Sequence, residues 1–347
     1  MPEVLQVDEI WELPLVVEGY TLERLSADGY ERETTQVHLL GAGEEGLGED
    51  VMLLREPDDA PPADLELAGS WTLASFIAHV ATVEQWRKPP EWEEFAKAFR
   101  NWAFESAALD LALRQAGLSL AEALGRSASP VRFVNSLGLG DPPSVDGIAQ
   151  RLARYPSVGF KLDADAKWTP EIVAELAGLA CVLTVDFKGR YDLAVEDEDA
   201  LIAMYRAVVP TFPEALFEDP HDLPEVTELL EPVWDRVSFD APVRTVSDIT
   251  TRTINVKPSR IGRLRELLAI YAWCADNGVG MYGGGMGELG VGRGQIELLA
   301  SLFHPDAPND VAPSAFNAVE LGDGLPGSPL MPPAAFAPGF RWEAATS

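Results

Sequence analysis

Six charged residues stand where predicted apolar strands end. They are Lys161, Asp163, Asp186, Glu218, Asp240 and Lys257. In a parallel α/β barrel the carboxyl ends of the strands meet at one mouth, which is where the active sites of such barrels lie. Three acids at that mouth would repel one another unless a cation lay between them. Because all-oxygen ligands favour Mg²⁺ or Mn²⁺ over zinc, the sequence predicts a divalent metal site.

Each acid taken singly has a simpler interpretation. A carboxylate directly after a strand often caps the following helix or lies in a solvated turn. The four histidines of the chain show no spacing typical of a metal site. Three acids in successive units, with lysines after two further strands, favour one metal site over three unrelated caps.

The elements that must position these residues follow from hydrophobic periodicity. Residues 1–55 alternate apolar runs with glycines, which predicts a small antiparallel sheet with turns, and residues 56–65 are typical of a loop. Residues 72–125 have a helical spacing, with stops at Gly117 and Gly125. After Pro130, strands are expected at 131–137, 159–162, 181–186, 215–218, 237–240, 253–257 and 279–282, and helices at 145–155, 170–177, 199–208, 223–230 and 260–277.

This alternation of strands and helices implies a parallel sheet, and seven or eight units suit a closed barrel. No G-x-G-x-x-G motif follows an early strand, so a doubly wound dinucleotide-binding sheet has no support. We therefore expect an α+β domain over residues 1–127, a barrel domain over 128–320, and an irregular tail over 321–347 that packs on the surface.

The composition excludes several classes of protein. The chain has 347 residues, of which 47% are hydrophobic, as in ordinary globular proteins. Its 26 basic and 56 acidic residues give a net charge of −30, which would repel nucleic acid and anionic membranes. Two cysteines, Cys181 and Cys274, make no disulfide framework, and the N-terminal stretch lacks the basic segment of a signal peptide. We expect a cytoplasmic protein that binds neither nucleic acid nor a membrane.

Three stretches are specific enough to indicate a family. They are ESAALDLALRQAGLSLAEALG (105–125), INVKPSRIGRL (254–264) and GGGMGELGVGRGQIELLASL (283–302). With these motifs the chain resembles the muconate-lactonizing subgroup of the enolase superfamily, and is most similar to o-succinylbenzoate synthases and N-acylamino acid racemases. The resemblance implies a (β/α)7β modified TIM barrel with an N-terminal α+β capping domain. It also implies that Asp186, Glu218 and Asp240 bind the metal and that Lys257 is the sixth-strand lysine.

The resemblance further implies a reaction. Mg²⁺, or alternatively Mn²⁺, would stabilise the enolate formed when a proton α to the carboxylate of a small substrate is removed. Lys257 is the expected base, and Lys161, which matches the family's auxiliary lysine, is expected as charge partner to a metal-binding acid or as a substitute base. Gly285, Met286 and Glu288 are expected near the substrate, and Glu288 is a candidate partner of Lys257. The implied reaction is most like the dehydration performed by o-succinylbenzoate synthases. Racemization of N-acylamino acids or dipeptides, and a metal-binding barrel that has lost catalysis, are the alternatives; homo-oligomerisation, common among relatives, stays open.

The second strand departs from the family pattern. The family usually has Lys-x-Lys there, and the second lysine moves the proton, whereas this chain has Lys161 followed two residues later by Asp163. Because residues two apart share a strand face, we expect these two side chains to pair. Lys188 stands where the family often has asparagine, which makes Lys188 and Asp163 further catalytic candidates. Asp240 after the fifth strand and Lys257 after the sixth are only 17 positions apart, so the fifth helix is expected to be a stub.

Overall fold

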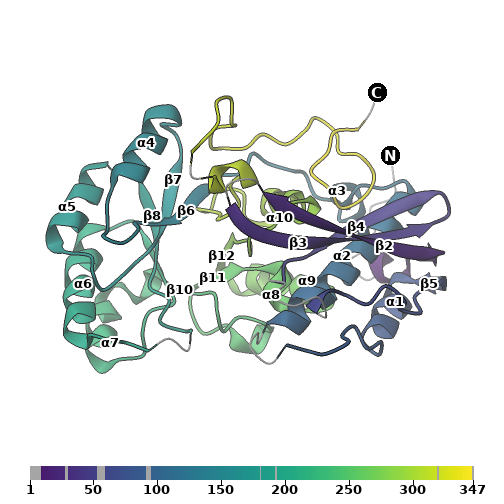
Figure 1. Ribbon diagram of the computed structural model, residues 1–347, viewed down its shortest axis with the longest axis horizontal. Helices are drawn as coiled ribbons and strands as arrows, with labels where there is room; N and C mark the ends of the chain where they lie inside the picture. Colours follow the sequence, from purple (N-terminus) through teal and green to yellow (C-terminus); the bar gives the residue numbers. More distant parts are fainter. Residues whose placement is uncertain are drawn as a thin grey trace.

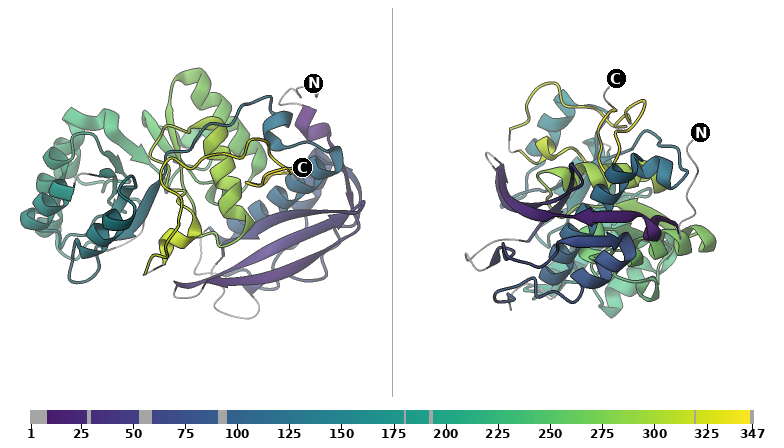
Figure 2. Two further views of the ribbon diagram at one scale, coloured as in Figure 1. Left: turned by 90° about the horizontal axis from the view of Figure 1, so that it is seen from above. Right: turned by 90° about the vertical axis from the view of Figure 1, so that its right-hand side faces the viewer.

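The computed structural model describes residues 9–27, 30–52, 59–90, 95–179, 181–191, 194–318 and 320–345. Parts of three expectations lie outside these ranges: the N-terminal residues 1–8, the end of an apolar run at 53–54, and the start of the loop at 56–58. Antiparallel strands with helices precede residue 125, and parallel strands alternating with helices follow residue 130 (Figure 1 and Figure 2). No helix in the described ranges is long and apolar enough to cross a membrane.

The N-terminal part is built on a three-stranded antiparallel sheet. The strands β2 (Gly19–Ala27), β3 (Tyr30–Gly41) and β4 (Glu44–Asp50) pair in that order, and the long helix α2 (Ala96–Ala116) packs against β4. A Cβ atom on Gly46 or Gly48 would lie 2.3 Å or 2.0 Å from a carbonyl oxygen of α2. The sequence pattern suggests turns at these glycines, but they lie inside a strand, where the absent side chain lets the helix approach closely.

Smaller elements complete this part of the chain. After the 3₁₀ turn η1 (Glu9–Glu12), strand β1 (Pro14–Val17) pairs antiparallel with β5 (Gly69–Thr72), which leads into α1 (Leu73–Val80). The short helix α3 (Leu120–Ala123) follows α2. Thr72 and Ser119 begin α1 and α3 with capping boxes. Gly117 ends α2 with a left-handed φ of 68°, as its position in the sequence predicts.

The C-terminal part is a seven-stranded parallel sheet whose strands pair in chain order from β6 to β12. Its successive elements are β6 (Val134–Gly138), α4 (Asp146–Arg154), β7 (Gly159–Asp163), α5 (Pro170–Leu179), β8 (Val182–Asp186), α6 (Glu198–Thr211), β9 (Leu216–Glu218), α7 (Pro224–Leu230), η3 (Glu231–Arg236), β10 (Val237–Phe239), η4 (Val246–Asp248), β11 (Thr253–Val256), α8 (Pro258–Ile261), α9 (Leu264–Asn277), β12 (Gly280–Gly283) and α10 (Val291–Phe303), and the 3₁₀ turn η5 (Ser314–Asn317) follows. Only η4 follows β10, which confirms the expected stub in place of a fifth helix.

The two edges of the parallel sheet are connected by residues Asn309 and Asp310. Asn309 forms a parallel bridge with Phe133 beside β6, and Asp310 forms one with Gly284 beside β12. The amide of Val134 donates to the carbonyl of Asn309 at 2.8 Å. These two residues occupy the place of the eighth strand, so the described elements follow the expected (β/α)7β order.

The capping part and the barrel meet along α2. Gly262, between α8 and α9, has a φ of 76°, and a Cβ atom there would lie 2.6 Å from the Cα of Ala98 in α2. The side chain of Asn101 donates to the carbonyl of Gly262 at 2.6 Å. One turn further along α2, the carboxylate of Glu105 accepts the amide of Leu264 at 2.6 Å. A capping-domain acid thus caps the first turn of barrel helix α9.

The C-terminal residues run back from the barrel to the capping domain. Leu330 pairs with Val131 next to β6, and Gly339 forms a bridge with Ser119 next to α3. Asp110 of α2 is fully buried and accepts the amide of Phe340 at 2.6 Å and the Nε of Arg341 at 2.8 Å. The tail therefore fastens to both parts of the molecule; it is drawn in yellow in Figure 1.

We expect Glu105→Gln to make the protein more stable at pH 8 and to change its stability little at pH 4. Burial raises the pKa of Glu105 to about 7, despite the amide of Leu264 that favours the charged form. Between about pH 4.5 and 7 the unfolded chain therefore holds fewer protons than the folded one, so stability falls as pH rises. Glutamine still accepts the Leu264 amide but carries no charge to bury.

Urea unfolding of both proteins at several pH values checks this prediction. The stability difference should grow by about 1–3 kcal/mol between pH 4 and pH 8, at about 1.4 kcal/mol per pKa unit. Glu228→Gln, which changes an exposed glutamate of α7, is the matched control and should show no such growth. A constant difference between Glu105→Gln and wild type at all pH values would contradict the assignment.

Candidate metal and acid–base site

The sequence-predicted acids and lysines come together at the carboxyl ends of the barrel strands. The parallel register aligns Asp163 of β7 with Asp186 of β8, and Asp186 with Glu218 of β9. Asp240 directly follows β10, and Lys257 directly follows β11. Asp186, Glu218 and Asp240 are each no more than 1% exposed, which is unusual for acidic side chains.

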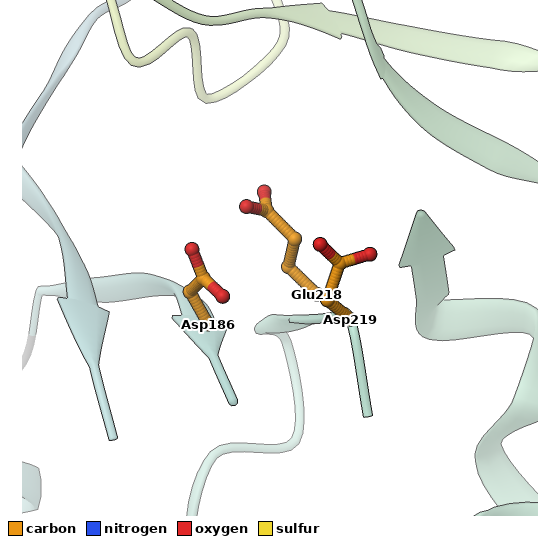
Figure 3. Close-up of side chains that lie close together, drawn as sticks. All are labelled: Asp186, Glu218 and Asp219. Atoms are coloured by element: carbon orange, nitrogen blue, oxygen red, sulfur yellow. The ribbon is translucent and has the colours of Figure 1, made fainter. Parts of the chain in front are cut away.

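Three carboxylates form the tightest acidic group among the described residues. Asp186, Glu218 and Asp219 each offer an oxygen, and these oxygens lie within 4.8 Å of one another (Figure 3). Asp219 is missing from the sequence-based set, although it directly follows Glu218. Its φ of 47° is unusual for a residue other than glycine, and its two oxygens accept the amides of Asp240 and Ala241, both at 2.9 Å.

Asp240 has cationic partners instead of a place in this acidic group. Its Oδ2 lies 2.8 Å from the Nζ of Lys257, and its Oδ1 lies 2.6 Å from the Nη1 of Arg260. Burial opposes the charge on Asp240, but the cations outweigh burial and hold its pKa well below the ordinary value. In this structure the carboxylate that lies near Asp186 and Glu218 is therefore that of Asp219. The role of Asp240 as the third metal ligand stays a prediction.

Lys161 is fully buried and lies among acids. Its Nζ contacts a carboxylate oxygen of Glu218, lies 3.1 Å from Asp186 and lies 3.8 Å from Asp310. Burial alone would lower the pKa of Lys161, but Glu218 and Asp186 raise it well above the ordinary value. This buried ammonium is a permanent cation that fixes the acids in place.

The expected pair between Lys161 and Asp163 is wrong. The long side chain of Lys161 reaches across β8 to β9, and Asp163 instead lies 3.0 Å from the Nζ of Lys188. Lys188 has a left-handed φ of 55°, donates its amide to Asp186 at 3.0 Å, and returns its ammonium to the same carboxylate. That turn brings the third-strand lysine to the end of the second strand.

Glu218 is the acid on which most of the network converges. One of its oxygens contacts Lys161, and the other accepts hydrogen bonds from the Tyr282 hydroxyl and, at 3.1 Å, from Asn255. Burial raises the pKa of Glu218 to about 8. Lys161 opposes this shift, whereas the charge of neighbouring Asp186 adds to it. Glu218 therefore holds a proton near neutral pH when only protein cations are present.

The charges of the site do not balance. Its linked acids are Asp163, Asp186, Glu218, Asp219, Asp240 and Asp310, and its linked cations are Lys161, Lys188, Lys257 and Arg260. With every group charged, these described residues carry two negative charges in excess. Burial also raises the pKa of Asp219, to about 6, so protons relieve part of this excess. The oxygen donors and the excess of two charges fit a divalent cation such as Mg²⁺.

The glycine-rich loop after β12 lies beside Lys257, and the expected role of Gly285, Met286 and Glu288 near the substrate stays a prediction. Glu288 accepts the amide of Met286 at 3.0 Å and pairs with Arg293 at 3.5 Å, so the expected pair with Lys257 is absent among the described contacts. The amide of Gly285 donates to the carbonyl of Asp310 at 3.2 Å. A Cβ atom on Gly284 would lie 2.7 Å from the Cε of Lys257, so glycine there makes room for this lysine.

Residues of the capping domain also bind the glycine-rich loop after β12. Arg32 donates to the carbonyl of Met286 at 2.7 Å. Glu49 is 1% exposed and accepts three amides at the start of α10, from Leu289 at 2.6 Å, Gly290 at 3.0 Å and Gly292 at 2.9 Å. The loop beside Lys257 is thus ordered by residues that lie more than 230 positions earlier in the chain.

Sequence reasoning missed several residues of this site. Arg260 is 1% exposed and donates to the Tyr191 hydroxyl at 2.6 Å, which in turn donates to Asp240 at 3.4 Å. The sequence could have predicted Asn255 as a site residue, because it lies two residues before Lys257 and so shares its strand face. Asp310 could not be predicted in this way, because it lies in the two-residue eighth strand.

The barrel and its capping domain have the enolase-superfamily fold, which solved structures of that superfamily confirm. A dipeptide epimerase from Methylococcus capsulatus, solved with a Mg ion, matches with a TM-score of 0.66 and 16% identity, over 88% of this chain and 92% of its own. A muconate cycloisomerase from Pseudomonas fluorescens matches with a TM-score of 0.66 and 19% identity, over 94% and 96%. At these identities the structures show the fold alone.

The chain belongs to the family of the domain of unknown function DUF8230. The N-terminal domain of that family matches residues 8–123, and its C-terminal domain matches residues 127–318. Among curated relatives, an o-succinylbenzoate synthase from Geobacillus stearothermophilus is 27% identical over 70% of this chain and 68% of its own length. An N-succinylamino acid racemase from Thermus thermophilus is 28% identical over 91% and 89%. These relatives are enzymes, and they confirm the resemblance seen in the sequence.

Proposed function

We propose that this protein is a divalent-metal-dependent lyase that removes a proton α to the carboxylate of a small substrate, most like an o-succinylbenzoate synthase. The observation that carries the proposal is the buried acidic group of Asp186, Glu218 and Asp219, with two excess negative charges in its network and Lys257 at the adjoining strand end. A relative named o-succinylbenzoate synthase supports it.

The acids would hold Mg²⁺, or Mn²⁺, with Asp240 as a further candidate ligand. When bound, the cation would supply Lewis-acid stabilisation for the negative charge that develops on the substrate carboxylate. Lys161 stays charged and keeps Asp186 and Glu218 at a fixed separation, so these acids need not reorganise during the reaction.

Lys257 is the proposed base. Its neutral amine accepts the α proton, and the electrons of the C–H bond move into the enolate. For elimination, the Lys257 ammonium then returns the proton to a β-hydroxyl group, which leaves as water. β11 and β7 are separated by three strands of the sheet, so Lys257 and the second-strand end lie on different sides of the mouth.

A racemase or epimerase of N-acylamino acids or dipeptides is the second candidate. It needs an acid–base group on each face of the substrate, and the Lys188 ammonium at the end of the second strand is the observation that favours it. The N-succinylamino acid racemase that matches 91% of this chain points the same way.

The decisive experiment separates these functions. In D₂O with Mg²⁺, we expect the purified protein to dehydrate the substrate of o-succinylbenzoate synthases. NMR spectra recorded over time measure this dehydration. N-succinylamino acids are tested in parallel for α-proton exchange and loss of optical activity. Racemization without dehydration would favour the second candidate. Tight Mg²⁺ binding without either reaction would indicate a barrel that has lost catalysis.

A further inference from the structure

We propose that Lys188 binds an oxygen of the anionic substrate at the second-strand side of the mouth, with Asp163 holding its ammonium in position. In this chain the second strand carries an acid, Asp163, where the family has a lysine, and the third strand carries Lys188 where the family often has asparagine. The inference rests on the proposed function, because it requires a carboxylate substrate at the metal.

Accessibility singles out Lys188 among the cations of the site. The side chains of Lys161 and Arg260 are each 1% exposed and that of Lys257 is 7% exposed, whereas that of Lys188 is 33% exposed. Lys161 lies among three carboxylates, and Arg260 lies against Asp240 and the Tyr191 hydroxyl. Lys188 is therefore the cation of this network whose side chain is most accessible to solvent.

The ammonium of Lys188 is positioned before a ligand arrives. Its Nζ lies 3.0 Å from Asp163, contacts Asp186 and lies 5.9 Å from the centre of the Tyr191 ring. The left-handed backbone at Lys188 directs the side chain back over its own strand end. Fixed in this way, the ammonium loses little conformational freedom on binding an oxygen acceptor.

A purely structural role explains the pair less well. The side chains of Asp163 and Lys188 are 41% and 33% exposed, so solvent reaches this pair even though the Asp163 oxygen in contact with the ammonium is buried. Asp186 already has a buried cationic partner in Lys161, so Lys188 is the second cation on this carboxylate. The pair therefore adds an accessible positive charge beside the metal-binding acids, which is what an anionic substrate can use.

The test measures ligand binding by calorimetry with Mg²⁺ present, using o-succinylbenzoate and N-succinylphenylalanine as probes. We expect Lys188→Ala to weaken binding of the probe that wild type binds by about 10–100-fold, the range for a hydrogen bond to a charged group. Mg²⁺ alone should bind at least as tightly as in wild type, because a cation beside Asp186 has been removed. Lys167→Ala, which breaks an exposed pair with Asp141, is the matched control and should change neither affinity.

A reciprocal exchange sharpens the test. Asp163→Lys alone places two cations together and Lys188→Asp alone places two acids together, so each should weaken probe binding. The double variant restores one charge of each sign and should recover affinity to within about 10-fold of wild type. Unchanged probe affinity in Lys188→Ala would overturn this inference and leave the proposed function standing. Failure of wild type to bind Mg²⁺ or either probe would overturn both.

Discussion

Replacing Lys257 with alanine should lower the rate of α-proton exchange by about 10³-fold or more while the protein stays folded. A positioned acid–base group contributes about 10²–10⁴-fold, and Lys257 follows β11 at the mouth beside the buried acids of the candidate metal site. The lost cation also leaves Asp240 paired with Arg260 alone, so this acid keeps a partner and the fold has no unpaired buried charge there.

Exchange into D₂O, followed by NMR with the substrate that wild type accepts, measures this effect. Lys167→Ala removes an exposed lysine that pairs with Asp141 and is the control for a general loss of positive charge. Asp163→Ala should reduce exchange less than Lys257→Ala, because Asp163 acts through Lys188. Rapid exchange or racemization that survives in Lys257→Ala would show that another group is the base.

Glu218→Gln should weaken Mg²⁺ binding by about 100-fold or more. It removes one charge from the three carboxylates that lie within 4.8 Å of one another, and leaves Lys161 with Asp186 and Asp310 as partners. Because a metal ligand must be deprotonated, wild-type affinity should rise as the pH is raised through about 8, the pKa of Glu218 without metal, and then level off. Binding should also release protons below that pH.

Calorimetry in two buffers of different ionisation enthalpy measures both affinity and proton release. Glu297→Gln is the matched control, because burial raises the pKa of Glu297 to about 7 but this acid lies on α10, outside the acidic group. Comparing Asp219→Asn with Asp240→Asn identifies the third ligand as the variant that loses more affinity. A wild-type affinity that does not change with pH would contradict the assignment of Glu218.

The polar ends of the strands were predictable because apolar strands and charged residues alternate regularly along the sequence. Which charges pair was not, because pairing depends on side-chain reach and on local backbone shape. Lys161 extends past its neighbouring strand to Glu218, and the left-handed backbone at Lys188 directs that lysine to Asp163. Neither the type of a residue nor its spacing along the chain predicts how far its side chain reaches or whether its backbone is left-handed.

Other parts of the fold were hidden for similar reasons. The eighth strand is reduced to Asn309 and Asp310, too short for any periodicity. Gly46 and Gly48 are residues typical of turns, but they lie in strand β4 where helix α2 packs against it. The α2 residues that they face are about 60 positions away in the sequence. Helix stops at glycine were correct, because their cause is local.

The return of the tail to α2 has a consequence for synthesis. Asp110 lies 230 positions before its partner Phe340, and Glu49 lies 240 positions before Leu289. While a ribosome is still making the barrel, Asp110 has the amide of Leu47 but lacks its C-terminal partners. Glu49 has the Thr34 hydroxyl but lacks the three amides at the start of α10, so burying either acid at this stage would be costly. The capping domain, although translated first, should therefore remain incompletely folded until after residue 341 has emerged, and folding should be slow because these contacts are so distant in sequence.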